Sequence, residues 1–245
     1  MRTSVAVVAM AAALTAGAQN PNQKFVQALT GMNSVNVASM VYSGTATVAT
    51  PAPSGKPAPP AAVAKYAVAI NYGTMSSKTE IERTSSPRRV VQFLSGGQAW
   101  DVTDGKRPTS LPAAVSARER EIWMTPHGLL KAAQDPASQR HMAMETGLDG
   151  QTVTTMTFTV GGADLKATLN DAAVIVRVET VPEDSMRGDV GIEITYADYR
   201  DYGGIKFPTH IVKKQGGRTV LDLMVSDVRP NAGLYVEVPD RLLKK

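Results

Sequence analysis

Two pairs of adjacent glycines divide residues 196–228 into three short segments. Gly203-Gly204 and Gly216-Gly217 supply the positive φ angles that tight hairpin turns require. Apolar and polar residues alternate between the turns, and alternation is typical of an antiparallel sheet with one covered face. This third of the chain therefore predicts three antiparallel strands, and it contains no motif that indicates a chemical activity.

The first residues predict an export signal. Arg2 precedes an apolar run over residues 5–14, and Ala16-Gly17-Ala18 forms an A-x-A cleavage site. The run has about half of the roughly 20 residues that a membrane-spanning helix needs. We therefore expect a signal peptide over residues 1–18, and a protein that is periplasmic or secreted and soluble after cleavage. No later segment predicts a transmembrane span.

The absence of cysteine and the scattered charge exclude several classes of protein. The 245 residues include no cysteine, so disulfides and a lipid-anchoring cysteine are both excluded, and the fold must be held by its own apolar core. Residues 19–245 suffice for one domain with a sizeable core. The net charge of +4 is spread along the chain rather than gathered in a stripe, so we expect no nucleic-acid partner.

Many short extended segments precede and follow one helical region. The Pro-rich residues 50–62 predict a loop between two strands, since proline cannot join a strand ladder. In the second of these strands, over residues 63–72, Tyr66, Val68 and Ile70 share one face. The sequence also predicts a short helix over residues 22–31.

The strong helical region covers residues 116–134. Ser116 and Glu119 fit a capping box, which predicts a helix start at Ser116. Thr125 and Pro126 fit an N-cap followed by proline at the first helical position, which indicates a second start. Asp135-Pro136 is expected to end this second helix.

Roughly ten strands and two or three helices in this order favour an α+β fold. We expect an incomplete, strongly curved antiparallel β-barrel with helices packed against one side. The eleven methionines could fill the core or line an adaptable apolar cavity, and the sequence leaves both interpretations open. Our candidates for residues that line or pack a ligand cavity are Val153, Met156, Phe158, Leu221, Leu223 and Met224.

Candidate catalytic groups are few. The separations of His127, His141 and His210 match no compact metal motif, and no G-x-S-x-G elbow is present. The carboxylate pairs Asp101 with Asp104, and Asp198 with Asp201, lie near expected turns, where Asp is common for local hydrogen bonding. Tyrosines at 196, 199 and 202 either form an aromatic lip for a ligand or cap the core. We therefore predict a protein that is not an enzyme and has no metal or cofactor.

Three segments resemble a domain of exported bacterial proteins. They are residues 123–133, 196–210 and 225–231. In many relatives this domain precedes a metallo-β-lactamase-fold hydrolase, and its fold resembles that of the outer-membrane lipoprotein carrier and related lipoprotein-sorting proteins. The resemblance implies an incomplete barrel closed by helices around an apolar cavity. The hydrolase's H-x-H-x-D-H cluster has no match here, so we expect that module to be absent and carry over no catalytic residue.

Two functions follow as hypotheses. The first is non-catalytic binding, in the periplasm, of an apolar or amphiphilic ligand such as a lipid or a lipoprotein acyl chain. The alternative is a protein-interaction or regulatory module that docks on a separate hydrolase of the cell envelope.

Overall fold

The computed structural model describes residues 20–49, 61–84, 88–147, 150–180 and 191–243. The expected signal peptide and most of the expected Pro-rich loop lie outside these residues. Residues 61 and 62, which we expected in that loop, already belong to a strand. This difference is small, because Ala61 and Ala62 pair with the neighbouring strand and carry no proline.

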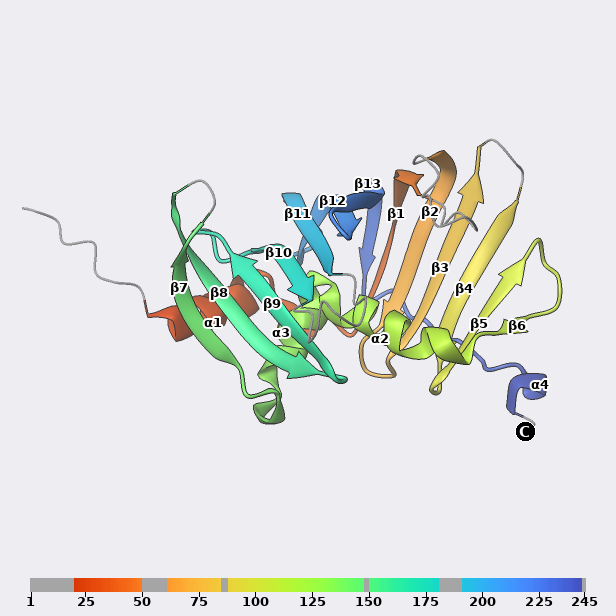
Figure 1. The fold of residues 1–245 in the computed structure, drawn as a ribbon, viewed down its shortest axis with the longest axis horizontal. Helices are drawn as coiled ribbons and strands as arrows, with labels where there is room; N and C mark the ends of the chain where they lie inside the picture. The colour runs from red at the N-terminus through yellow and green to blue at the C-terminus, as the bar shows by residue number, and fades with distance from the viewer. Residues whose placement is uncertain (1–19, 50–60, 85–87, 148–149, 181–190, 244–245) are drawn as a thin grey trace, which may run out of the picture.

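The described residues form one curved sheet of thirteen strands, more than the ten or so expected (Figure 1). Each pair of neighbouring strands is antiparallel, which confirms the expected sheet type. The strands are β1 (Ser39–Val48), β2 (Ala61–Asn71), β3 (Ser76–Arg83), β4 (Arg89–Ser95), β5 (Gln98–Thr103), β6 (Thr109–Ser110), β7 (His141–Thr146), β8 (Thr152–Val160), β9 (Ala163–Leu169), β10 (Ile175–Thr180), β11 (Ile192–Asp201), β12 (Lys206–Gln215) and β13 (Arg218–Pro230).

The first and last strands meet in the middle of the sheet. The strand order is β6-β5-β4-β3-β2-β1-β13-β12-β11-β10-β9-β8-β7, so β6 and β7 are the two free edges. The helical segment between β6 and β7 in the sequence must therefore cross from one edge to the other. This crossing places the helices over the concave face, and the sheet remains an incomplete barrel, as expected.

Glycines fix the turns and one bulge. Gly203, Gly204, Gly216 and Gly217 have φ angles of 67°, 85°, 58° and 75°, which confirms the turns expected at both pairs. Gly44 lies in β1 where the register with β13 shifts. A Cβ on Gly44 would lie 1.9 Å from the Met224 carbonyl oxygen, so only glycine fits this bulge.

Three main helices lie on the concave side (Figure 1). They are α1 (Pro21–Gly31), α2 (Val115–Met124) and α3 (Pro126–Gln134), and short 3-10 turns η1 (Ser34–Asn36), η2 (Pro112–Ala114) and η3 (Pro136–Ser138) flank them. Helix α2 packs on β3–β5, and α1 packs on β7 and β8. None of the helices among the described residues is long and apolar enough to cross a membrane.

The helix starts test two sequence predictions. The Thr125 hydroxyl accepts a hydrogen bond from the Gly128 backbone N–H, and Pro126 is the first residue of α3, as expected. The capping box at Ser116 is wrong: α2 begins at Val115, and its N-cap residue Ala114 makes no side-chain cap. The 3-10 turn η2 leads directly into α2, so the chain is already helical before Ser116.

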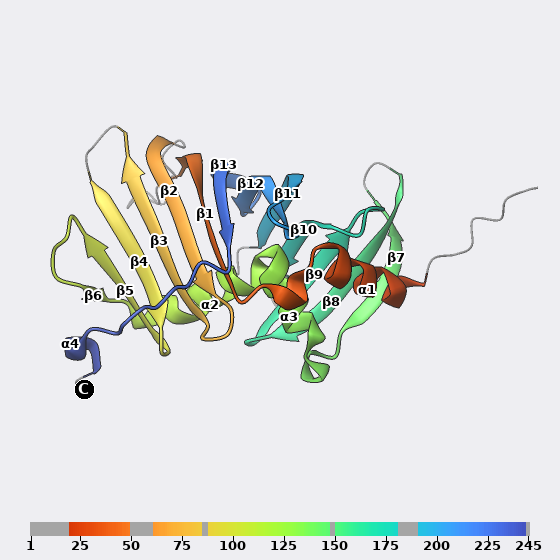
Figure 2. The same ribbon diagram turned by 180° about the vertical axis from the view of Figure 1, so that it is seen from behind.

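The last described segment crosses the other face of the sheet (Figure 2). Residues 231–239 run from the end of β13 towards β4 and end in α4 (Asp240–Leu243). The Ser95 hydroxyl donates to the Val236 carbonyl at 2.8 Å, and the Asn71 amide donates to the Leu234 carbonyl at 3.3 Å. The concave face, which the helices cover, therefore faces away from this segment.

Candidate functional site

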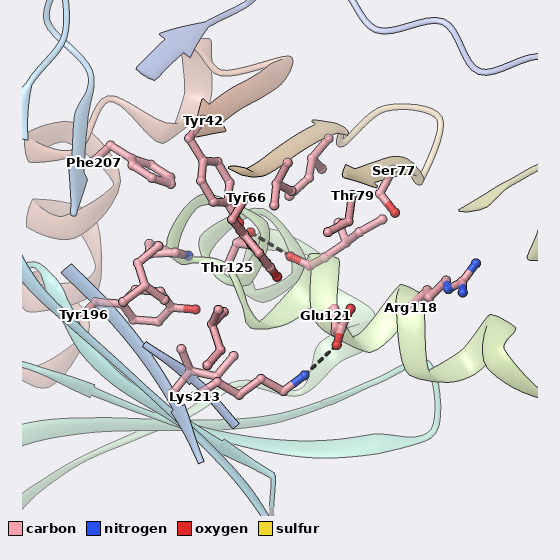
Figure 3. Close-up of a pocket in the computed structure, with 17 residues that line it drawn as sticks. Tyr42, Tyr66, Ser77, Thr79, Arg118, Glu121, Thr125, Tyr196, Phe207 and Lys213 are labelled. Atoms are coloured by element: carbon pink, nitrogen blue, oxygen red, sulfur yellow. Dashed lines mark hydrogen bonds and ion pairs between the residues drawn. The ribbon is translucent and has the colours of Figure 1, made fainter. Parts of the chain in front are cut away.

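A cavity of about 80 Å³ lies between α2 and the centre of the sheet (Figure 3). Strands β1–β3 form one wall, and β11–β13 form the other. The lining residues are Tyr42, Tyr66, Val68, Ile70, Ser77, Thr79, Arg118, Glu121, Ile122, Thr125, Pro126, Ile194, Tyr196, Phe207, Ile211, Lys213 and Leu221. The shared face that the sequence predicted for Tyr66, Val68 and Ile70 is confirmed, since all three contribute to this lining.

The apolar wall is supported from behind by His127. Phe207 lines the cavity, with its ring centroid 4.9 Å from that of Tyr42, and the fully buried His127 ring stacks on Phe207 at 6.2 Å. His127 Nε2 lies 3.0 Å from the Lys206 carbonyl, which can only accept, so Nε2–H donates to it. Nδ1 then accepts from the Ser34 hydroxyl at 2.8 Å. Burial lowers the pKa of His127 to about 4, so this histidine is neutral at physiological pH.

Tyrosine hydroxyls near the cavity fall into two groups. The Tyr196 hydroxyl donates to the Met124 carbonyl at 2.7 Å, and the Tyr72 hydroxyl lies 3.3 Å from that of Thr125. Within the described part of the chain, the Tyr42 and Tyr66 hydroxyls have no hydrogen-bond partner. Figure 3 shows both rings directed into the cavity. Burial raises the pKa of both phenols, so they remain protonated donors.

Three charged residues line the cavity, and one of them is fully engaged elsewhere. Arg118 on α2 donates to the Phe93 and Trp100 carbonyls at 2.7 and 3.0 Å and pairs with Asp101 at 2.5 Å. These bonds fasten α2 to β4 and β5. The other two, Lys213 on β12 and Glu121 on α2, pair across the cavity with an Nζ–Oε1 distance of 2.5 Å (Figure 3).

The six candidate ligand residues lie in different parts of the sheet. Leu221 lines the cavity, and Leu223 is buried in the same strand. Met224 points outwards with 49% of its surface exposed. The three candidates on β8 lie in the other half of the sheet, where Met156 and Phe158 are buried and Val153 is half-buried. Their part in ligand binding stays a prediction.

The candidate catalytic residues have structural surroundings. His141 opens β7, and His210 Nε2 lies 2.9 Å from an Asp222 carboxylate oxygen on the neighbouring strand. Asp104 and Asp201 accept hydrogen bonds from the Arg89 and Gly204 backbone N–H groups, as expected near turns. Among the residues that the structure describes, no group of three or more His, Asp or Glu side chains could hold a metal ion.

The other two tyrosines of the expected cluster pack against the core. Tyr199 donates to the Ile175 carbonyl at 2.5 Å, and Tyr202 is partly buried beside the core. Tyr196 alone of the three lines the cavity. Tyr199 and Tyr202 therefore fit the core-capping interpretation, whereas an aromatic lip for a ligand stays a prediction.

Two larger hollows, of about 420 and 430 Å³, lie around η3 and the β8–β9 turn. Both open broadly to the surface, and both include Ala137, Ser138 and Thr159. The smaller central cavity lies between helix and sheet and is walled mostly by apolar and aromatic side chains, as ligand sites usually are. We therefore take the central cavity as the candidate site.

Comparison with solved structures gives the fold. A LolA superfamily protein from Nitrosomonas europaea is 16% identical, with a TM-score of 0.50 over 93% of this chain and 99% of that chain. A DUF1329 family protein from Desulfovibrio piger is 9% identical, with a TM-score of 0.53 over 89% of this chain and 96% of that chain. The fold is LolA-like. Neither the protein-family models nor the curated proteins give a match to this sequence.

This LolA-like fold confirms the curved, incomplete barrel that the sequence predicted. The association with a metallo-β-lactamase-fold hydrolase stays a prediction. Sequence reasoning missed Tyr42, Glu121 and Lys213 as cavity residues. Tyr66 was readable because it is in phase with inward apolar neighbours on its strand. The same signal exists for Tyr42, which lies on the same face of β1 as the buried Met40.

Proposed function

We propose that this protein binds an apolar or amphiphilic ligand, such as a lipid or a lipoprotein acyl chain, without catalysing a reaction on it. The observation that carries the proposal is the apolar cavity between α2 and the sheet. Val68, Ile70, Ile194 and Ile211 present aliphatic surface to it. Burial of a ligand's apolar surface there contributes about 25 cal/mol per Å².

The cavity is too small for an acyl chain in the conformation that the structure shows. The volume of about 80 Å³ is well below the about 300–1,000 Å³ that ligand sites usually measure. An acyl chain therefore fits only after α2 moves away from the sheet. Helix α2 is held by the Arg118 bonds, the Lys213–Glu121 pair and the Tyr196–Met124 hydrogen bond. Its Ile122 and Met124 side chains are also buried in the core, so this movement would break apolar contacts as well.

Export is part of the proposal. The expected signal peptide supports a periplasmic or secreted location. An amphiphile that crosses this aqueous space needs a protein that buries its apolar part. Mass measurement of the protein recovered from cells tests this part. We expect a mature chain that begins at Gln19, and a chain that retains Met1 would contradict export by this signal.

A matched pair of variants tests the binding site. Leu221→Asp places a charge in the cavity wall, and Met224→Asp places the same charge on the exposed face of the same strand. Displacement of a fluorescent fatty-acid probe measures affinity. We expect Leu221→Asp to weaken binding at least tenfold, because the charge loses solvation beside an acyl chain, and Met224→Asp to leave it unchanged. A wild-type protein that binds no amphiphile would favour the alternative, an interaction module for a separate envelope hydrolase.

A further inference from the structure

The Lys213–Glu121 pair distinguishes the cavity from a purely apolar one. Its two partners come from opposite sides, Lys213 from β12 and Glu121 from α2 (Figure 3). Arg118 is engaged by two carbonyls and Asp101, so it offers no comparable free charge. Within the described residues, Glu121 is the only ion-pair partner of Lys213.

The two partners differ in their access to water. The Lys213 side chain is 18% exposed, whereas the Glu121 side chain is 52% exposed. Separation of the pair would leave a Lys213 ammonium with little solvation, which is costly, while Glu121 would be solvated at little cost. The site therefore needs a negative charge beside Lys213 far more than it needs a positive charge beside Glu121.

The neighbouring wall supplies hydrogen-bond donors. The Tyr42 and Tyr66 hydroxyls face the cavity and have no partner in the described part of the structure, and Ser77 and Thr79 add two more hydroxyls to the lining. Glu121 lines the same cavity as Tyr66, and burial together with this carboxylate raises the pKa of the Tyr66 phenol. A carboxylate or a phosphate has only acceptor oxygens at neutral pH, and it therefore complements several hydroxyl donors beside an ammonium.

We propose that the cavity selects an amphiphile with an anionic head group, a carboxylate or a phosphate, which replaces Glu121 as the partner of Lys213. The inference rests on the proposed function, because the acyl chain still provides most of the buried surface. In the empty protein, Glu121 then occupies the position beside Lys213 that the ligand's anionic head group takes when it binds. It compensates Lys213 while the site is empty and turns towards solvent when the ligand binds.

The test compares four ligands that share one alkyl chain and differ only in the head group. Dodecanoate, dodecyl phosphate, 1-dodecanol and dodecyltrimethylammonium are titrated into the protein, and their affinities are measured by displacement of a fluorescent probe. We expect an anionic ligand to bind about tenfold more tightly than dodecanol, and the cation to bind most weakly. Tighter binding of dodecanoate would assign a fatty-acid carboxylate, and tighter binding of dodecyl phosphate would assign a phosphate head group.

Two variants should change the affinity for the anion in opposite directions. Lys213→Gln removes the cation and should abolish the preference over dodecanol. Glu121→Gln removes the competing carboxylate and should tighten binding of the anion about two- to fivefold. Lys214→Gln is the control, since Lys214 pairs with Glu193 at 3.2 Å, away from the cavity lining, and should change neither affinity.

The outcomes separate this inference from the function on which it rests. Equal binding of dodecanol and the anions, or a loss of affinity in both Lys213→Gln and Glu121→Gln, would overturn the anionic preference and leave apolar binding intact. Dodecanol binding reports whether each variant keeps its cavity. If Lys213→Gln does not fold, the gain expected for Glu121→Gln still decides the question. Failure of all four ligands to bind would overturn the proposed function itself.

Discussion

The two halves of the curved sheet bury their concave faces in different ways. Over β8–β10, the interior is filled mainly by apolar side chains, although Thr154, Thr155 and Thr168 are also buried on these strands. Met156, Leu165, Leu169 and Ile175 have no exposed surface there. Over β1–β3 and β11–β13, the interior instead receives tyrosines, small hydroxyls and an ion pair, and a cavity remains.

The filled half favours stability, and the half with the cavity is the one to which we assign the proposed binding. Close packing without polar atoms maximises dispersion and apolar burial. The Tyr42 and Tyr66 hydroxyls have no hydrogen-bond partner among the described residues, and they are therefore available to a ligand in the cavity.

The largest effect should come from a charge in the filled half. Met156→Asp places a carboxylate where no surface is exposed, and we expect a loss of more than about 4 kcal/mol and failure to fold. Urea unfolding followed by circular dichroism measures this. Met224→Asp is the control and should cost less than about 1 kcal/mol. A stable Met156→Asp protein would show that the two halves are not packed differently.

Acid should act on His127, which supports Phe207 in the cavity half. Burial lowers the pKa of His127 from 6.5 to about 4, so between these values the unfolded chain binds a proton that the folded protein does not. The contribution of the neutral His127 to the free energy of unfolding is fully present above pH 6.5. It falls by about 3 kcal/mol as the pH is lowered to about 4. Urea unfolding at several pH values measures this loss.

A second titration separates His127 from the carboxylates. Hydrogen bonds from Arg89 and Lys65 lower the pKa of Glu80 from 4.5 to about 2, so its contribution is lost only below pH 4.5. His127→Gln should flatten the stability profile above pH 4.5 and leave the decline below it. An unchanged slope in His127→Gln would contradict the assignment.

The smallest changes in stability should come from removal of single tyrosine hydroxyls in the cavity half. Tyr196→Phe leaves the buried Met124 carbonyl without its donor and should cost about 1–2 kcal/mol. Tyr66→Phe removes a hydroxyl that has no partner among the residues the structure describes. It should change stability by less than about 0.5 kcal/mol while it weakens binding of the anionic ligand. Equal destabilisation by both substitutions would show that the Tyr66 hydroxyl is structural.

Local patterns predicted local structure well. The paired glycines required positive φ angles in any fold, and Thr125-Pro126 formed the start of α3 because the cap involves only the residues that follow it. The capping box at Ser116 failed because the preceding turn η2 had already set the helix geometry. Phase along a single strand was also readable, as Tyr66, Val68 and Ile70 show.

The site itself depends on contacts that no local pattern encodes. The pairing of β1 with β13 joins segments near the two ends of the described chain. It connects the wall that contains Tyr42 to the wall that contains Leu221. Lys213 and Glu121 are separated by 92 residues. Along β13, Leu221 faces the cavity and Met224 faces outwards, and alternation alone does not say which face the helices will cover.

The most direct test of the central claim is native mass spectrometry of the protein isolated from its own cells, followed by organic extraction and lipid analysis. The account predicts one amphiphile per chain with a carboxylate or phosphate head group, retained by Met224→Asp and lost from Leu221→Asp. A protein that is isolated empty and that refuses added lipids would contradict it.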